Sequence, residues 1–261
     1  MKTGCFCTVA QLPLVAEAGL QEAELPVQEL MELSEQRVGW LGRYARELGL
    51  GLTVFSGLVP MQLRITSPDF SMDEWRVYFD RAAGRAAEVG CEMIPLGAGK
   101  CRSIYPEYGP SAVQQDRVRR FSAELCRIFL RHGLTLVIEP LGRPYSNYLN
   151  RIGETEAFVH TLGHPNCAVM CDLRHMEDSR EPWKEIPRWR ACLRHAHVDY
   201  PIGAHRLLPQ DDDGYNYAPY FGALAASGYR GIVTVEATDD DLSQLQRSAD
   251  FLRRLGEQAG L

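Results

Sequence analysis

The sequence predicts an α/β fold of the (β/α)8 TIM barrel type, with residues 1–261 in a single domain. Strand-like and helix-like segments alternate along the whole chain without a linker. Such alternation favours a parallel sheet with right-handed crossovers, and eight units favour closure into a barrel. The length of 261 residues agrees with this fold, because these barrels typically have about 250 residues. The loops after the predicted strands are long and the turns before them are short, as in barrels with a site at the C-terminal ends of the strands.

Apolar, β-branched runs predict the strands, and amphipathic stretches between capping residues predict the helices. In chain order we expect strands at residues 2–7, 22–25, 52–55, 92–96, 135–139, 168–172, 194–199 and 231–236. We expect helices at residues 11–18, 34–48, 72–89, 111–131, 154–162, 182–191, 220–226 and 242–257. Ser34 and Ser71 are the expected N-caps of two helices. A doubly wound open sheet is the alternative fold, but no glycine-rich phosphate loop follows the first strand.

Four of the predicted strands end in a side chain that can bind a metal ion. We refer to these four side chains as the strand-end cluster: Glu139, Asp172, His197 and Glu236. Each follows an apolar run, where an ionisable group is costly unless it is paired or bound to a cation. Because the C-terminal ends of the strands meet at one face of a barrel, three carboxylates and an imidazole would come together there. The cluster therefore predicts a site for a divalent metal ion.

Composition limits the other functions of the chain. Hydrophobic residues make up 45% and charged residues 24%, as in an ordinary soluble globular enzyme. The net charge of −6 argues against nucleic acid as a partner. No apolar run approaches the ~20 residues of a membrane span, and the first residues lack a signal peptide's apolar core, so we expect no membrane partner and a cytoplasmic protein. The eight cysteines have no CxxC spacing, and we expect reduced, mostly buried thiols.

The residues around the strand-end cluster resemble those of a known family. The strings that carry the resemblance are Glu139-Pro-Leu-Gly-Arg, Asp172-Leu-Arg-His175-Met, His197-Val-Asp and Val235-Glu236-Ala. They are similar to the sugar phosphate isomerase/epimerase family of xylose isomerase-like TIM barrels, to which D-tagatose 3-epimerase belongs. The resemblance extends over the whole chain. His164-Pro-Asn166, for example, precedes the strand that ends in Asp172, as in the family.

The resemblance implies which residues bind the cofactor and the substrate. The strand-end cluster would bind one divalent ion, Mn²⁺ first, with Mg²⁺ or Co²⁺ as the other candidates. The implied substrate-binding residues are His175, Arg206, Arg143 and Tyr145. One stretch departs from the family. The epimerases carry Asn-Arg-Phe-Glu where this chain has Gly142-Arg-Pro-Tyr145, so a tyrosine replaces a substrate-binding glutamate.

The expected activity is that of a metal-dependent carbohydrate epimerase or isomerase. Glu139 and Glu236 would be the catalytic pair: one removes a proton next to a carbonyl, and the other returns a proton to the resulting enediolate. A lyase or dehydratase acting on a keto-sugar, cyclitol or glycoside through the same enediolate is the alternative. A non-catalytic sugar-binding protein is an alternative from another class. We expect a small-molecule carbohydrate as the ligand and, by family analogy, a homo-oligomer, either a dimer or a tetramer.

Several other residues carry weaker expectations. Glu24, at the end of the second strand, could support a metal ligand or contact the substrate. We expect His195 to alternate in direction with His197 and to pack beneath a helix, with a contact that supports a metal ligand as the alternative. Residues 211–213 are expected to form a solvated turn. The pocket walls are expected to include four tyrosines: Tyr105, Tyr108, Tyr145 and Tyr148.

Overall fold

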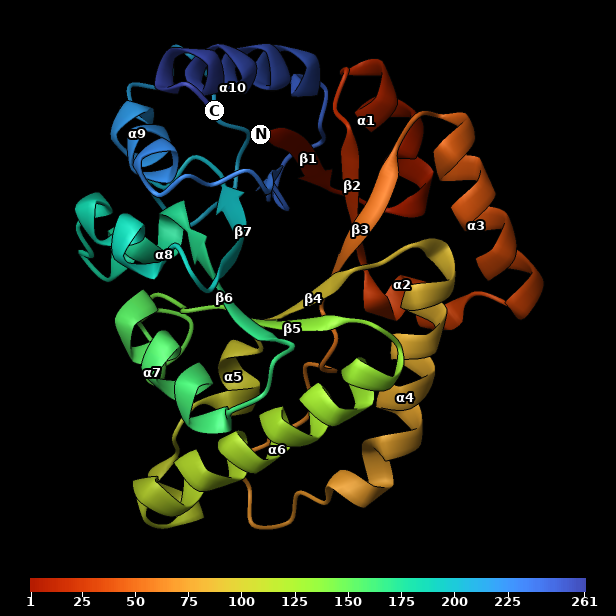
Figure 1. Ribbon diagram of the computed structural model, residues 1–261, viewed down its shortest axis with the longest axis vertical. Coiled ribbons are helices and arrows are strands. Elements are labelled where there is room, and N and C mark those ends of the chain that lie inside the picture. The colour runs from red at the N-terminus through yellow and green to blue at the C-terminus, as the bar shows by residue number, and fades with distance from the viewer.

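The computed structural model describes residues 1–261 and contains eight parallel strands that close into a barrel in sequence order (Figure 1). Strand β1 pairs with β2 on one side and with β8 on the other, which closes the sheet. The predicted (β/α)8 fold is therefore confirmed. The strands are β1 (Lys2–Phe6), β2 (Glu22–Pro26), β3 (Gly51–Ser56), β4 (Met93–Leu96), β5 (Thr135–Ile138), β6 (Cys167–Asp172), β7 (Leu193–Val198) and β8 (Ile232–Val235).

Helices surround the barrel on its outer side, as Figure 1 shows. The α-helices are α1 (Leu12–Glu17), α2 (Val27–Glu32), α3 (Glu35–Glu47), α4 (Met72–Val89), α5 (Gly99–Arg102), α6 (Ser111–Arg131), α7 (Ile152–Leu162), α8 (Leu173–Asp178), α9 (Ala218–Ala226) and α10 (Leu245–Ala259). Three 3₁₀ helices are η1 (Val9–Gln11), η2 (Pro106–Tyr108) and η3 (Trp183–Trp189). Ser34 caps α3 as predicted, because its hydroxyl accepts the Arg37 N–H at 3.3 Å.

One predicted helix is wrong. Residues 182–191 contain the 3₁₀ helix η3 with Pro187 inside it. Proline has no N–H to donate and its ring clashes with the preceding turn, so an α-helix cannot continue through it. The α-helix of this unit is α8, which begins directly after β6 and was not predicted. The short helices α2 and α5 were also missed, because four to six residues are too few for a helical period to be recognised.

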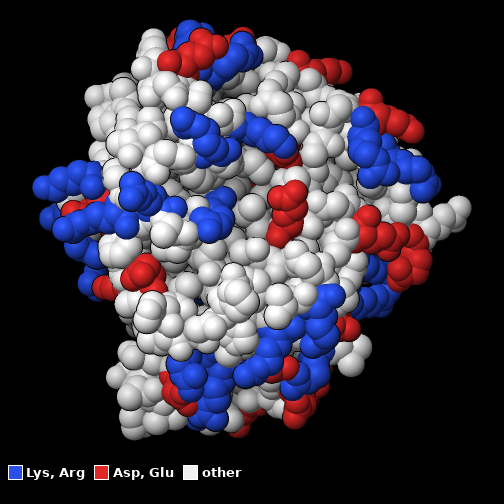
Figure 2. Space-filling model, in the orientation of Figure 1, with Lys and Arg blue, Asp and Glu red and all other residues white.

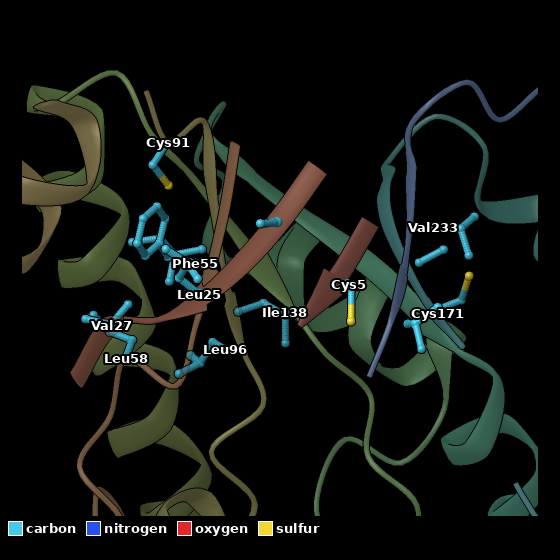
Figure 3. Packing of buried hydrophobic residues seen from close by; sticks show 14 of the residues in the cluster. Cys5, Leu25, Val27, Phe55, Leu58, Cys91, Leu96, Ile138, Cys171 and Val233 are labelled. Atoms are coloured by element: carbon cyan, nitrogen blue, oxygen red, sulfur yellow. The ribbon is translucent and has the colours of Figure 1, made fainter. Parts of the chain in front are cut away.

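Alternating side chains of the strands face two different environments. The outward side chains join the helices in a hydrophobic core of 65 buried residues. Figure 3 shows this packing at Cys5, Leu25, Phe55, Ile138 and Cys171. None of the eight cysteines forms a disulfide, and six are buried, so the prediction that the thiols are mostly buried is confirmed. A separate small cluster of Val137, Ala168 and Met170 fills part of the barrel interior.

Much of the rest of the barrel interior is polar. Near the N-terminal ends of the strands, the buried Glu22 carboxylate accepts the Lys2 ammonium at 2.6 Å and the Thr53 hydroxyl at 2.8 Å. Further along the barrel lie Glu24 and His195, which are almost fully buried. Buried polar groups need partners to offset their lost hydration. The interior of this barrel is therefore a hydrogen-bonded support beneath the C-terminal ends of the strands.

Surface charges of both signs are mixed. On the face drawn in Figure 2, basic and acidic side chains occur among one another. Many form ion pairs within a helix, such as Asp116 with Arg119 at 2.6 Å, and exposed pairs of this kind contribute little to stability. None of the helices combines the length and the apolar character that crossing a membrane would require.

Two buried arginines hold the loops that leave the strands. Arg102, at the end of α5, donates to the carbonyl oxygens of Leu96 at 2.9 Å, Glu139 at 2.6 Å and Leu149 at 3.3 Å. It thereby joins the loops after β4 and β5. Burial lowers the pKa of Arg102 to about 10, so its guanidinium stays charged at neutral pH. Its charge is compensated by carbonyl dipoles, because no carboxylate is close enough to form a salt bridge with it.

Arg174, in the first turn of α8, has the same role for the loop after β7. Its Nε donates to Asp199 Oδ2 at 2.6 Å. Its remaining N–H groups donate to backbone carbonyls of this loop, including those of Gly203 and His205, each at 2.8 Å. The next residue after this clamped segment is Arg206. These hydrogen bonds hold the loop after β7 in place, and the Arg206 side chain that follows reaches the C-terminal end of the barrel.

We predict that Arg102→Leu lowers the free energy of unfolding by about 3 kcal/mol or more, because three buried carbonyl oxygens lose their donor. Urea unfolding followed by circular dichroism measures this change. Arg43→Leu is the matched control, since Arg43 is exposed on α3 and should change stability by less than about 0.5 kcal/mol. Equal effects of the two substitutions would contradict the clamp.

Candidate metal centre

The four side chains of the strand-end cluster meet at the C-terminal ends of β5 to β8. Each offers one ligand atom, and these atoms all lie within 4.8 Å of one another. His197 Nδ1 is 3.3 Å from Glu236 Oε2, 3.8 Å from Asp172 Oδ2 and 3.8 Å from Glu139 Oε1. Glu139 and Glu236 immediately follow β5 and β8, whereas Asp172 and His197 are the end of β6 and the penultimate residue of β7. Four consecutive strands thus each supply one group.

Asp172 has two separate contacts because it also begins a helix. Its Oδ1 accepts the backbone N–H of His175 at 3.0 Å and so caps α8. Its Oδ2 points to the other members of the cluster. The cap fixes the rotation of the carboxylate, so the second oxygen is directed to the site by the helix that follows.

Glu139 has room in the site only because a glycine lies beside it. A Cβ atom on Gly97, in the loop after β4, would overlap the Oε2 atom of Glu139. The Glu139 carboxylate forms no hydrogen bond with the protein, and the salt-bridge contacts to His175 and His197 are long, at 3.7 and 3.8 Å. Burial, together with the neighbouring Glu236 charge, raises the pKa of Glu139 to about 8. An oxygen donor with so few protein partners is available to a cation.

The two ring nitrogens of His197 face different groups. Its Nε2 lies 3.2 Å from both carboxylate oxygens of Glu24, deeper in the barrel. Its Nδ1 is buried, has no hydrogen-bond partner and faces the three carboxylates. Burial would lower the pKa of His197, but the Glu24 and Glu236 charges outweigh it and raise that pKa. Three oxygens and one unpartnered imidazole nitrogen fit a divalent ion of the Mn²⁺ or Mg²⁺ type.

Arg206 and His175 lie directly against the cluster. Arg206 forms an ion pair with Glu236, and its Nη1 is 3.5 Å from Asp172 Oδ2. Its Nη2 is 3.0 Å from His175 Nε2. Because arginine can only donate, His175 Nε2 accepts this bond, and the ring proton is on Nδ1, which has no partner. Burial lowers the pKa of His175 to about 4, so this imidazole is neutral.

The two glutamates of the cluster have opposite pKa shifts. Burial would raise the pKa of Glu236, but Arg206 and His197 outweigh it and lower that pKa. The pKa of Glu139 is raised, because the compensating charges are closer to Glu236. Two carboxyl groups whose environments separate their pKa values in this way can act as an acid and a base in the same site.

The structure places some of the other predicted substrate-binding and pocket residues beside the cluster and others away from it. The Tyr145 ring lies 4.8 Å from the His175 ring and 5.6 Å from Arg206 Cζ, so it faces the site. Arg143 is exposed and lines a depression on the outer side of α6 and α7, away from the cluster. Tyr148 packs against Phe158 of α7. The remaining tyrosines, Tyr105 and Tyr108, contact each other with tilted rings whose centroids are 5.2 Å apart. Of the four tyrosines, Tyr145 is the one whose ring contacts His175 and Arg206 beside the cluster.

The expected position of His195 is wrong. Residues two apart in a strand share a face, so His195 points into the barrel with His197, and their ring centroids are 4.8 Å apart. His195 Nε2 is 2.9 Å from Glu24 Oε2. The predicted turn at residues 211–213 is confirmed, and it is held by ion pairs from Asp211 to Arg247 and Arg254 of α10.

Comparisons with known proteins agree with this architecture. A sequence model of the family described as xylose isomerase-like TIM barrel matches residues 12–255. The probable ketose 3-epimerase of Synechocystis is 24% identical over 218 residues, which cover 82% of this chain and 73% of that protein. The D-psicose 3-epimerase of Agrobacterium fabrum is 24% identical over 198 residues, which cover 70% of this chain and 64% of that protein. The crystal structure of D-psicose 3-epimerase with D-tagatose from Clostridium cellulolyticum superimposes with a TM-score of 0.84 at 19% identity over 99% of both chains.

We predict that Arg206→Met destabilises the protein in EDTA, and more at pH 8 than at pH 4. Arg206 lowers the pKa of Glu236 below its ordinary value of 4.5, so the stability it provides is present above that pH and is lost as the pH falls. At pH 8 the loss should be about 3 kcal/mol, because the remaining carboxylates are buried without their main cation. Urea unfolding at both pH values measures it. A loss that does not depend on pH would mean that Arg206 contributes by packing alone.

Proposed function

We propose that this chain, which belongs to the xylose isomerase-like TIM barrel family, is a divalent-metal-dependent ketose 3-epimerase that inverts a stereocentre next to the carbonyl of a keto-sugar. The observation that carries the proposal is the strand-end cluster, with its two glutamates of opposite pKa shift at the two ends of the row. The two curated relatives described above are a probable ketose 3-epimerase and a D-psicose 3-epimerase, which supports the same chemistry.

The strand-end cluster would hold the ion, and Mn²⁺ suits its three carboxylates and single imidazole best, with Mg²⁺ and Co²⁺ as alternatives. The bound ion supplies positive charge that stabilises the substrate enediolate when a proton leaves the carbon next to the carbonyl. Metal binding requires deprotonated ligands, so the proton held by Glu139 near neutral pH must leave when the site is loaded.

The two glutamates move the proton. Glu236 is kept ionised by Arg206 and His197, so its carboxylate accepts the proton from the substrate carbon. Glu139, at the other end of the row, returns to that carbon, from another direction, a proton taken up from water, and Glu236 releases its proton to water before the next turnover. The two roles exchange in the reverse reaction. Removal and return of the proton on opposite faces invert the stereocentre.

Three further residues orient the substrate. His175 Nε2 lies 3.7 Å from Glu139 Oε1, so this ring nitrogen faces the site and can accept a hydrogen bond from a sugar hydroxyl. Arg206 adds N–H groups beside it. The Tyr145 ring gives an apolar surface against which the C–H face of a sugar can pack. Arg143 has no place in this proposal, because the structure does not bring its side chain to the cluster.

Tyr145 also favours a second candidate, a lyase or dehydratase acting on a keto-sugar, cyclitol or glycoside. The ring lies against His175 at a position where the epimerases that the sequence resembles have a substrate-binding glutamate. An enzyme without that carboxylate could expel a β-substituent from the enediolate instead of reprotonating carbon. A cytoplasmic location and a dimeric or tetrameric assembly stay predictions, as does the lack of a nucleic-acid partner.

We predict that incubation with keto-hexoses and Mn²⁺ in D₂O incorporates deuterium at the carbon next to the carbonyl, with formation of the C3 epimer, as read by NMR. Glu236→Gln should still bind Mn²⁺ but lose turnover by about 10²–10⁴-fold, because an amide cannot accept the proton. Glu257→Gln, on the exposed face of α10, is the matched control. Asp172→Asn and His197→Ala should fail through loss of metal binding, with partial rescue by excess Mn²⁺.

Two results would contradict these assignments. Turnover near that of the wild type by the Mn²⁺-loaded Glu236→Gln variant would exclude Glu236 as a base. Deuterium incorporation with release of water or of an alcohol, and no epimer, would identify the lyase or dehydratase instead.

A further inference from the structure

A second buried polar group lies beneath the strand-end cluster. It consists of Glu24 on β2, Ser56 on β3 and His195 on β7, and we refer to it as the Glu24 network. The Glu24 side chain is 1% exposed and the His195 side chain is fully buried. In the closed barrel β7 is separated from β2 by β8 and β1, so the Glu24 carboxylate reaches across the interior. A carboxylate so placed is costly unless donors satisfy both of its oxygens.

Donors from two strands, β3 and β7, satisfy the Glu24 carboxylate. The Ser56 hydroxyl donates to Oε1. His195 Nε2 is 2.9 Å from Oε2, and His197 Nε2 is 3.2 Å from each oxygen. An ionised carboxylate can only accept, so each imidazole must carry a hydrogen on Nε2. In the neutral His197 ring, Nδ1 is then left with a free lone pair.

That lone pair points toward the strand-end cluster, so His197 connects the Glu24 network with the candidate metal site. His197 Nδ1 is buried, lacks a hydrogen-bond partner and faces Glu139, Asp172 and Glu236. A histidine that binds a metal through one nitrogen generally donates its other N–H to a carboxylate or carbonyl, which fixes the ring and its tautomer. The interactions of His197 follow this arrangement.

We infer that Glu24 is a positioning residue that, supported by Ser56 and His195, holds His197 in the Nε2–H tautomer and presents Nδ1 to a divalent ion. The inference rests on the proposed function, because it concerns the ion of the same site. Glu24 itself has no path to the substrate, since its carboxylate is already engaged by Ser56 and the two histidines. The alternative role of Glu24 as a substrate contact is thereby set aside.

The test compares two equivalent substitutions on one strand. Glu24→Gln replaces one of the two oxygens that face His197 Nε2 with an N–H₂ group. A fraction of the His197 rings should therefore adopt the Nδ1–H tautomer, which cannot bind an ion through that nitrogen. Glu22→Gln is the matched control: Glu22 is also buried on β2, but it contacts Lys2 and Thr53 and not the histidines. Calorimetric titration with Mn²⁺ should show 10–100-fold weaker binding by Glu24→Gln, with little change for Glu22→Gln.

A second measurement does not depend on metal. ¹⁵N NMR of the histidine side chains in EDTA is followed to a pH at which the His197 ring is neutral, because its pKa is raised. The remaining ring hydrogen of His197 should then be on Nε2 in the wild type and in Glu22→Gln, but on Nδ1 in a substantial fraction of Glu24→Gln. If Glu24→Gln does not fold, Ser56→Ala removes one donor only and should weaken Mn²⁺ binding by a few fold, whereas unchanged binding in that variant would argue against the network.

The outcomes separate the inference from the proposed function. A wild-type protein without Mn²⁺ binding would end the proposed function, while the tautomer measurement would still decide the role of Glu24. Equal Mn²⁺ affinity and an unchanged tautomer in Glu24→Gln would overturn the inference. Two ions per wild-type chain, falling to one in Glu24→Gln, would overturn it as well, since Glu24, His195 and His197 would then be ligands of a second ion.

Discussion

Mutual repulsion of three carboxylates, two buried and one partly exposed, is the constraint on which the rest of this structure depends. Glu139, Asp172 and Glu236 lie close together, and a negative charge on each of them would be costly. The protein offers only partial compensation, through Arg206 at Glu236 and through the His197 ring. Part of the remaining cost is visible as the raised pKa of Glu139. A bound cation would reduce this repulsion, and metal binding is therefore central to the proposed activity.

Keeping these groups together requires a scaffold that cannot relax. The strands provide it through alternation, which sends apolar side chains out to the helices and polar ones into the barrel. Arg102 and Arg174 then tie the strand-exit loops to the barrel through backbone carbonyls. The hydrogen bond that caps α8 fixes the rotation of the Asp172 carboxylate, and Glu24 holds the His197 ring through its contact with Nε2. Asp172 and His197 thus each have a support that lies outside the strand-end cluster.

The sequence was sufficient to predict the barrel and the strands that end in the four cluster residues, because apolar runs and their spacing are local signals. Contacts between distant segments leave no such signal. His195 and Glu24 are separated by 171 positions, and their hydrogen bond could not be predicted from either strand alone. The error at His195 came from the direction assigned within the strand, and the error at residues 182–191 came from overlooking Pro187. Arg143 was named by resemblance, yet its loop turns it outward.

The most direct test of the account is a crystal structure of the protein soaked in Mn²⁺, with anomalous diffraction recorded at the manganese edge. The account predicts one anomalous peak between the four side chains of the strand-end cluster. The carboxylate oxygens should lie about 2.0–2.6 Å from the peak, and Nδ1 of His197 should be the nitrogen that faces it. A peak between Glu24, His195 and His197 instead, or no peak at the C-terminal ends of β5 to β8, would contradict it.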